Sequence, residues 1–463
     1  MTTMEGRDSF IGLPGDKAYA AATSVFNLAA PVTPTAAVTA QTIDQIRAAI
    51  RYADTENVPI RVHTTGHGAP TARPMSGALL IRADLDGGVE VDAARRLVRI
   101  AAGTRWGAVI DAAAAHGLAA PHGSSPTVGV VGYLLRGGVS CYGRRVGVAA
   151  SSVRAIELVT ADGELRRADA SCDRELLWAL RGGGGGFGVV TSVELALFPA
   201  ATVVTGAAYW PAAHAERLLS IWRRWTLEAP DEATTTLRVL NLPKVPEVPA
   251  VLCAGTVVCV DGAVLSPTGD PSDAQRYADD LLRPMRAVAE PILDTWQLAA
   301  PPAAAQAHVD PVDPLPIYSD HLLLDEMGDE GAAAFLRVAG PGSGSVLTNA
   351  ELRQLGGALS AAAPEAGVLG QLDARYAYIG SGVPFGPVSP DAIMERCAVV
   401  RAALGPWDTG KTAPTFVGSL EQPQQHLSRP QVLAVDRVRA RVDPSGRFRA
   451  DIAPGSSERL AQL

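Results

Sequence analysis

A single histidine stands in a two-glycine turn at the end of a strand-like run. Residues 59–63 read Pro-Ile-Arg-Val-His, and residues 64–68 read Thr-Thr-Gly-His-Gly. Glycine adopts backbone conformations that other residues avoid, so successive N–H groups in such a turn can converge on an anion such as a pyrophosphate. His67, between Gly66 and Gly68, would present its imidazole as a nucleophile beside the bound group. Taken alone, the pattern also fits an ordinary turn with a solvated histidine.

Two further glycine-rich segments follow. Residues 123–138 mix glycines with apolar residues, a combination that suits backbone lying against a flat ligand. Residues 181–191 read Arg-Gly-Gly-Gly-Gly-Gly-Phe-Gly-Val-Val-Thr and look like a dinucleotide fingerprint. However, they follow a predicted helix over 173–180 and lead into a strand, the reverse of the order in a Rossmann unit. The sequence therefore argues against a Rossmann nicotinamide site.

The elements that must position these segments are predicted from spacing. Thr42 and Gln45 have the form of a capping box, and apolar residues at helical spacing continue to about residue 56, so a helix feeds the strand at residue 59. A second region, from about residue 201, has strands and helices separated by proline-rich connections. Its predicted strands are 237–240, 251–260, 346–352 and 375–379, and its predicted helices 211–228, 271–287 and 430–442.

Composition excludes several classes of protein. A chain of 463 residues exceeds the size at which one core usually splits, which predicts two domains. A net charge of −8 argues against nucleic acid and anionic membranes as partners. The five cysteines are an odd number and widely spaced, so neither a disulfide framework nor a zinc site is indicated. Without a leader-like start or a long apolar run, we expect a cytoplasmic protein.

In their order along the chain, these segments resemble a known family. Residues 65–68, 123–138, 144–147, 157–163 and 178–191 are similar to the FAD-binding domain of the vanillyl-alcohol oxidase / p-cresol methylhydroxylase superfamily. With Val-Asp-Pro-x-Gly-x-Phe over 442–448, the chain resembles the berberine-bridge-enzyme-like oxidases. The resemblance implies an α+β fold. It would have a two-subdomain FAD-binding (PCMH-type) domain over 1–200, a substrate-binding domain over 201–420 whose antiparallel sheet is covered by helices, and a C-terminal segment, 421–463, returning to the FAD-binding domain.

The resemblance implies that FAD is bonded covalently to His67. Many relatives carry a second tether, a cysteine just before Pro-Thr-Val-Gly, but here that position is Ser125, so we expect a monocovalent cofactor. Some polar anchors of relatives are also replaced, as at Gly186. The expected cofactor-binding residues are, besides His67, Arg61, Thr64, Thr65, Gly66, Gly68, Gly123, Ser124, Ser125, Thr127, Val128, Gly129, Gly132, Gly137, Gly138, Gly188 and Val190.

The residue that removes a proton from the substrate is less clear. Aligning a Gly-Gly pair places Ala361 where berberine bridge enzyme has its glutamate base. Glu351 and Arg353 would share one face of a strand, and Tyr376 and Tyr378 likewise, so these four are the catalytic candidates. A Glu-x-Arg pair also fits a structural salt bridge, and the tyrosines also fit simple packing. His321 is predicted as a solvated loop or helix-start residue.

The expected function is that of an FAD-dependent oxidase. It would transfer hydride from an alcohol or amine carbon of a secondary metabolite or sugar, and molecular oxygen would reoxidise the flavin to give H2O2. Val128 supports an oxidase, because relatives that react with oxygen tend to carry valine there. The expected partners are a small-molecule substrate and oxygen, and the oligomeric state stays open. The alternatives are a flavoenzyme for oxidative or redox-neutral cyclisation and a flavin-poor binding or scaffold protein.

Overall fold

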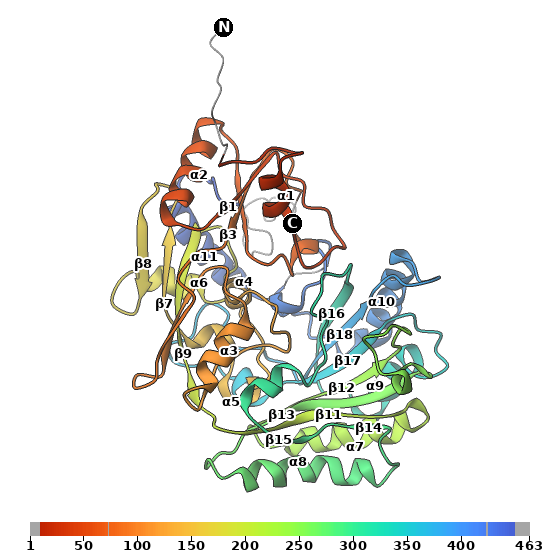
Figure 1. Cartoon of the computed structure of the whole chain (residues 1–463). Coiled ribbons are helices and arrows are strands. Elements are labelled where there is room, and N and C mark those ends of the chain that lie inside the picture. The colour runs from red at the N-terminus through yellow and green to blue at the C-terminus, as the bar shows by residue number, and fades with distance from the viewer. Residues whose placement is uncertain (1–9, 73, 423–424, 450–463) are drawn as a thin grey trace.

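The chain folds into two lobes (Figure 1). The computed structural model describes residues 10–72, 74–422 and 425–449. An upper lobe contains two small sheets and the last helix, and a lower lobe is built around one large antiparallel sheet. Helices and sheets are segregated in the lower lobe, which confirms the predicted α+β class.

The first subdomain of the upper lobe is a three-stranded parallel sheet in the order β1-β3-β2. The predicted capping box is confirmed, since the Thr42 side chain accepts from the Gln45 N–H and the Gln45 side chain accepts from the Thr42 N–H. Buried Ile46 and Ile50 pack the following helix onto the sheet core. The elements are α1 (Lys17–Thr23), β1 (Ala36–Ala40), α2 (Ile43–Thr55), β2 (Ile60–His63) and β3 (Leu79–Ala83).

The second subdomain is a five-stranded antiparallel sheet in the order β4-β5-β9-β7-β8. The glycine run of residues 181–188 follows α6 and precedes β9, the helix-then-strand order expected from the sequence. The elements are β4 (Val89–Asp92), β5 (Leu97–Ala101), α3 (Trp106–Ala114), β6 (Leu118–Ala119), α4 (Val130–Leu135), α5 (Gly143–Val146), β7 (Val153–Val159), β8 (Leu165–Asp169), α6 (Arg174–Leu180), β9 (Val189–Ala196) and β10 (Phe198–Pro199).

The lower lobe is an eight-stranded sheet in the order β14-β11-β13-β12-β17-β18-β16, with β15 also paired to β11. Its strands are β11 (Val203–Pro211), β12 (Ala233–Leu240), β13 (Val257–Val264), β14 (Leu293–Asp294), β15 (Gln297–Ala299), β16 (Tyr318–Leu324), β17 (Asn349–Gln354) and β18 (Tyr376–Gly382). The helices are α7 (Ala215–Glu228), α8 (Pro271–Arg286), α9 (Gly328–Ala339) and α10 (Pro390–Leu404). The strand predicted over 251–260 begins only at Val257, because Ala250–Cys253 form a 3-10 turn.

The two faces of this large sheet meet different surroundings. One face packs against the helices, where Leu237, Leu352 and Tyr378 join a core with Trp222 of α7 and Phe335 of α9. The opposite face turns to the upper lobe, and there Leu323 and Ala377 pack with Val139 and Leu369. Because successive side chains of a strand alternate between faces, register alone decides which residues reach the upper lobe.

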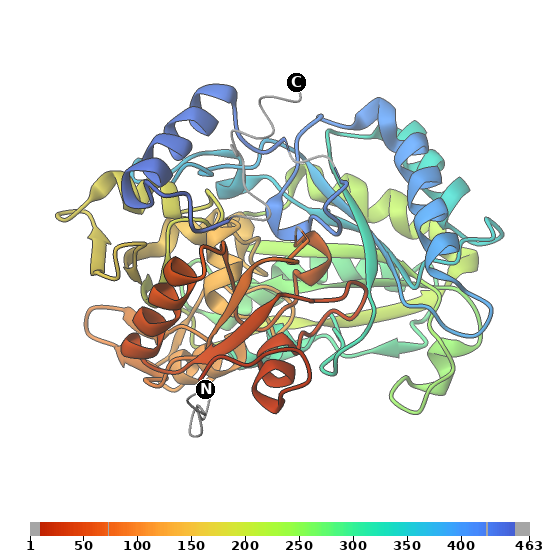
Figure 2. The ribbon, with the colours of Figure 1, turned by 90° about the horizontal axis from the view of Figure 1, so that it is seen from above.

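The chain returns to the upper lobe at its C-terminal end. Helix α11 (Arg429–Val442) lies beside the β7–β8 region, away from α10 (Figure 2). Its buried Val435 and Val438 belong to the upper-lobe core, and Arg441 forms a 2.7 Å ion pair with Asp173. Phe448 pairs with Ile60 of β2. The domain boundaries themselves stay predictions.

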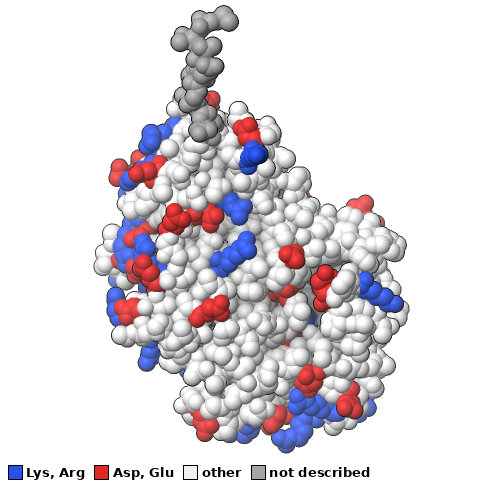
Figure 3. All heavy atoms as spheres, in the orientation of Figure 1, with Lys and Arg blue, Asp and Glu red and all other residues white. Residues whose placement is uncertain are grey.

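The surface carries mixed charge. On the face seen in Figure 3, Lys and Arg are interspersed with Asp and Glu. Among the described helices, none combines the length and the apolar character that a bilayer crossing requires.

Candidate functional site

His67 is held rigidly in its turn. Gly66 has a positive φ of 71°, and a Cβ there would lie 2.4 Å from Val25, so the turn needs glycine. The imidazole stacks on the Phe26 ring at 3.7 Å, and its Nε2 lies 3.0 Å from the Thr127 hydroxyl oxygen. Burial lowers the pKa of His67 to about 4, although a main-chain bond to Thr127 and the charge of Asp310 oppose the change. The ring is therefore neutral near pH 7, the form that acts as a nucleophile.

The glycine-rich segment of residues 123–138 lies directly against this turn. The Gly129 N–H donates to the Thr65 hydroxyl at 3.2 Å, and a Cβ on Gly129 would lie 2.5 Å from the Thr64 hydroxyl oxygen. Ser125 and Thr127 are joined by a hydroxyl–hydroxyl hydrogen bond of 3.0 Å. The structure therefore brings two of the predicted cofactor segments together.

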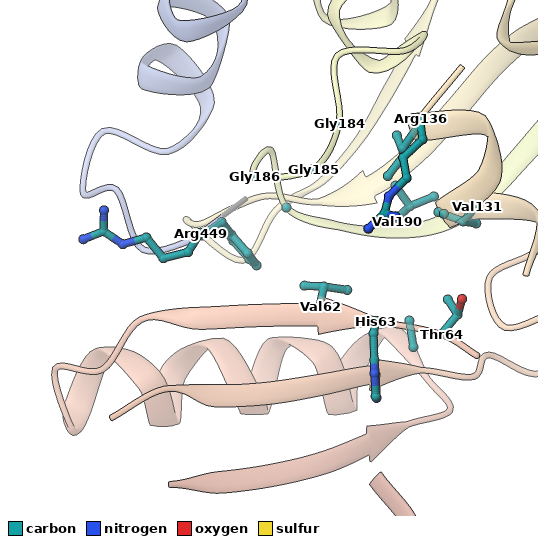
Figure 4. Close-up of a pocket in the computed structure, with 15 residues that line it drawn as sticks. Val62, His63, Thr64, Val131, Arg136, Gly184, Gly185, Gly186, Val190 and Arg449 are labelled. Atoms are coloured by element: carbon teal, nitrogen blue, oxygen red, sulfur yellow. The ribbon is translucent and has the colours of Figure 1, made fainter. Parts of the chain in front are cut away.

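A cavity runs between the two subdomains of the upper lobe (Figure 4). Strand β2 forms one wall, and α4, the glycine run and β9 form the other. A Cβ built on Gly132 or Gly185 meets no atom within 4 Å, so bare backbone faces open space there. Such a glycine-lined cleft fits the flat and anionic parts of a dinucleotide. The cavity is lined by Val62, His63, Thr64, Ala83, Val131, Gly132, Leu135, Arg136, Gly184, Gly185, Gly186, Gly188, Val190, Phe448 and Arg449.

The other predicted cofactor residues are placed differently. Gly137 and Gly138 have positive φ, and a Cβ on either would collide with Leu369 or Tyr133, so packing already requires glycine at both. Gly123 also packs against the Tyr133 ring. A Cβ on Gly68 would meet the Arg136 guanidinium, Arg61 is buried, and Val128 packs on the upper-lobe core. Their contact with a cofactor stays a prediction.

A buried group of ionised side chains lies on the face of the large sheet that turns to the upper lobe. Asp261 pairs with Arg238 at 2.7 Å, and His308 bridges Asp261 and Glu351 at 3.2 and 3.0 Å. Arg353 bonds the other oxygen of Glu351 at 3.0 Å. None of the five is more than 8% exposed. We call Arg238, Asp261, His308, Glu351 and Arg353 the charge cluster.

The members of the charge cluster hold one another in their ionised forms. Burial and Arg238 would lower the pKa of His308, but Asp261, Asp310 and Glu351 outweigh them and raise it to about 9. Burial alone would raise the pKa of Glu351, but Arg353 and His308 hold it well below its usual value. Near pH 7, Glu351 is therefore a carboxylate and His308 an imidazolium.

A second, small cavity lies between the charge cluster and residues 124–141. Ser124 connects the two sides, because its hydroxyl donates to the carboxylate of Asp310 at 2.6 Å. Burial raises the pKa of Cys141 to about 12, so its thiol stays protonated. The cavity is lined by Ser124, Ser140, Cys141, Thr234, Thr236, Asp261, Gly262, Ala304, Ala307, His308 and Arg353. Glu351 stands behind this wall and holds the two cations that form it.

The two tyrosine candidates lie on the wrong face of the sheet for this cavity. Leu352, not Glu351, pairs with Tyr378, so both tyrosines point to the helices. The Tyr376 hydroxyl bonds Thr226 of α7 at 2.9 Å and Glu326 at 3.0 Å. The structure brings Glu351 and Arg353 to the site but not the tyrosines, because their register places them one residue out of phase.

The prediction for His321 is wrong. It lies in β16, is fully buried, and its Nε2 accepts from the Ala413 N–H at 2.9 Å. Burial lowers its pKa to about 3. The residue is a structural hydrogen-bond acceptor that fixes the strand after the proline-rich connection.

Three members of the charge cluster were missed from the sequence. Asp261 follows an apolar run, Val-Val-Cys-Val, and Arg238 interrupts another, so each carried the signal of a charge in a buried strand. His308 lies between an alanine-rich stretch and a proline-rich connection and carried no comparable signal. Within the described residues, no group of acidic, His and Cys side chains has the arrangement of a metal site.

Comparison with known proteins agrees with this geometry. A family model described as an FAD binding domain matches residues 34–169. The chain is 32% identical over 227 residues to an uncharacterised FAD-linked oxidoreductase of Bacillus subtilis, covering 48% of this chain and 50% of that protein. It is 35% identical over 149 residues to (R)-6-hydroxynicotine oxidase of Paenarthrobacter nicotinovorans, 32% of either chain. The matches thus span half or less of these relatives.

Solved structures extend the likeness over nearly the whole chain. The BBE-like 1 protein of Physcomitrella patens superimposes with a TM-score of 0.81 at 19% identity, covering 96% of each chain. The 6-hydroxy-D-nicotine oxidase of Arthrobacter nicotinovorans gives 0.80 at 21% identity, covering 96% of this chain and 97% of that one. Residues 34–169 therefore belong to the FAD-binding domain family of the FAD-linked oxidoreductases, and the chain as a whole has the berberine-bridge-enzyme-like fold.

Proposed function

We propose that this protein is an FAD-dependent oxidase for a small polar molecule. It would remove hydride from an alcohol or amine carbon and hand the electrons to dioxygen, which becomes H2O2. The observation that carries this proposal is the charge cluster, which is buried, ionised and faces the motif segment that contacts His67. Buried ionised groups beside a cofactor cleft are typical of reaction sites.

The upper lobe would hold the cofactor. The cleft between β2 and the glycine run suits the dinucleotide part, and Thr64, Gly132, Gly188 and Val190 line it. His67 would carry the single covalent bond, since its imidazole is neutral and the position of a second tether is Ser125. When bound, FAD supplies the hydride acceptor and the site of reaction with oxygen.

The charge cluster would orient the substrate. Arg353 and His308 line the small cavity as cations, with Asp261 as an anion and several hydroxyl groups around them. A substrate hydroxyl or amine beside two cations loses a proton more readily, which is the step that must accompany hydride departure. Glu351 acts as a positioning residue in this proposal, because a carboxylate with so low a pKa is a weak base.

The names of the relatives suggest which substrates to try first. One is a hydroxynicotine oxidase, and another, from Microdochium nivale, is a carbohydrate oxidase that is 29% identical over 199 residues, 42% of this chain and 40% of that one. Sugars and heterocyclic amines both offer the polar atoms that the cavity would recognise. We therefore propose screening these two classes for anaerobic bleaching of the flavin.

Attachment and oxygen reactivity test the proposal. Acid-precipitated protein should stay yellow, His67→Ala should release the flavin, and Cys141→Ala should retain it. Photoreduced protein mixed with aerated buffer should reoxidise within seconds and form peroxide, as Val128 suggests. A colourless protein that resists reconstitution with FAD would contradict the proposed function, and a reduced spectrum that persists for many minutes would indicate a dehydrogenase.

A further inference from the structure

Two hydroxyl groups form a chain that ends on His67. The Ser125 hydroxyl lies 3.0 Å from that of Thr127, which lies 3.0 Å from Nε2 of the imidazole. All three side chains are only part-exposed. The other ring nitrogen, Nδ1, lies on the edge of the ring away from this chain.

The imidazole ring is fixed in both its plane and its direction. Phe26 stacks on it with an interplanar angle of 12°. Phe26 is itself held at both main-chain groups, because its N–H donates to the Thr65 carbonyl at 3.0 Å and its carbonyl accepts from the Leu315 N–H at 3.1 Å. A ring held in this way keeps Nε2 at Thr127.

The hydroxyl chain can select which nitrogen carries the proton. A neutral imidazole has one N–H and one lone pair, and only the nitrogen with the lone pair is nucleophilic. If Thr127 donates to Ser125, it accepts from Nε2–H and the lone pair is left on Nδ1. The main-chain bond to Thr127, which acts against the lowering of the His67 pKa by burial, has the sign of a carbonyl acceptor and also favours an N–H at this edge.

We propose that Thr127 and Ser125 are positioning residues for cofactor attachment, which hold the proton of His67 on Nε2 and leave Nδ1 as the nucleophile toward FAD. This inference rests on the proposed function and extends it. The bond formed joins Nδ1 to the 8α carbon, and one proton leaves that methyl carbon. A second proton leaves Nε2 to Thr127, while Thr127 gives its own to Ser125 and Ser125 releases one to solvent. The two electrons and two protons reduce dioxygen to H2O2.

The experiment follows attachment, with no substrate needed. Full-length protein from riboflavin-starved cells is mixed with FAD in air, and the flavin that stays with the acid-precipitated polypeptide is measured over time. Thr127→Val keeps the shape without the hydroxyl and should slow attachment about tenfold or more, as expected for loss of a buried hydrogen bond. Thr127→Ser, the matched control, should restore the rate to within about threefold, and Ser125→Ala should slow it by a smaller factor.

Total bound flavin and the tautomer provide independent readouts. Each variant should still bind FAD, which shows that it is folded, and nitrogen NMR of wild-type protein should show His67 protonated on Nε2. Wild-type attachment rates in both Thr127→Val and Ser125→Ala would overturn the inference, and so would a proton on Nδ1. If the wild-type protein oxidises substrate with FAD bound only non-covalently, this inference fails while the proposed function stands. If it binds no FAD, the proposed function itself fails.

Discussion

The two faces of the large sheet use the same strands for opposite purposes. On β17, Leu352 enters the apolar core under the helices, while its neighbours Glu351 and Arg353 enter the charge cluster. On β12, Leu237 and Arg238 divide in the same way. The helix face stabilises the lobe by excluding water from apolar side chains, and the opposite face keeps buried charges that stability alone would not favour.

This contrast shows where function is placed in the lower lobe. A buried ionised group is costly unless it is paired, and replacing a whole buried ion-pair network by apolar residues is often neutral or stabilising. The sheet thus retains charges only where the small cavity needs them. Variants on the two faces should differ both in what they lose and in how much.

The largest effect should come from breaking the charge cluster in its middle. Glu351→Gln removes the carboxylate that His308 and Arg353 share, which leaves two buried cations without their partner. We expect the free energy of unfolding to fall by about 3–5 kcal/mol, measured by urea denaturation. Asp162→Asn, which removes an exposed ion pair with Arg166, is the control and should cost less than about 1 kcal/mol. Equal losses in the two variants would contradict the contrast between the faces.

A second effect concerns turnover. Arg353→Met keeps much of the side-chain volume but removes the guanidinium that lines the small cavity. We expect anaerobic reduction of the flavin by substrate to slow by about 10²–10³, as when an oriented donor is removed from a reaction site. Arg353→Lys should recover part of the rate. A reduction rate within a few-fold of wild type in Arg353→Met would remove the charge cluster from the reaction.

A third effect is a pH dependence. The pKa of His308 is raised to about 9 in the folded protein, above its ordinary value of 6.5. The stability it contributes is therefore fully present below pH 6.5 and is lost as the pH rises through about 9. Flavin reduction should decline over the same upper range, because the cavity loses a cation. His308→Gln should flatten both profiles between pH 7 and about 10, and unchanged profiles in that variant would assign the titration to another group.

The smallest effects should come from the tyrosines on the helix face. Among the described residues, the buried Tyr378 hydroxyl has no hydrogen-bond partner, so Tyr378→Phe should be neutral or slightly stabilising. Tyr376→Phe loses the bonds to Thr226 and Glu326 and should cost about 1 kcal/mol. Both variants should reduce the flavin within a few-fold of the wild-type rate. A loss of about tenfold or more in either would restore a tyrosine as the proton acceptor.

Local patterns predicted the upper lobe well. The capping box at Thr42, the Gly-His-Gly turn and the helix-then-strand setting of the glycine run all depend on neighbours in sequence, and the structure has each of them. Spacing at period two also placed Glu351 and Arg353 on one face. Such predictions succeed because backbone preferences and alternation act within one element.

The rest of the site depends on pairing between distant strands. Whether Tyr378 shares a face with Glu351 is set by which residues pair across β17 and β18, and a shift of one residue reverses the answer. His308 reaches Asp261 and Glu351 from a loop, and no local pattern records such an approach. His321 looked solvated because its histidine side chain is polar, but tertiary packing gave it a buried acceptor role.

The pairing of Ile60 with Phe448 has a consequence for how the protein is made. Phe448 and Arg449 help to line the cleft between the two subdomains, so this cleft is assembled from residues that leave the ribosome early and residues that leave it late. Contacts between such distant segments form slowly, because a long loop must close first. The cleft is therefore complete only after residue 449 has been synthesised, and the cofactor enters a nearly finished protein instead of templating the emerging chain.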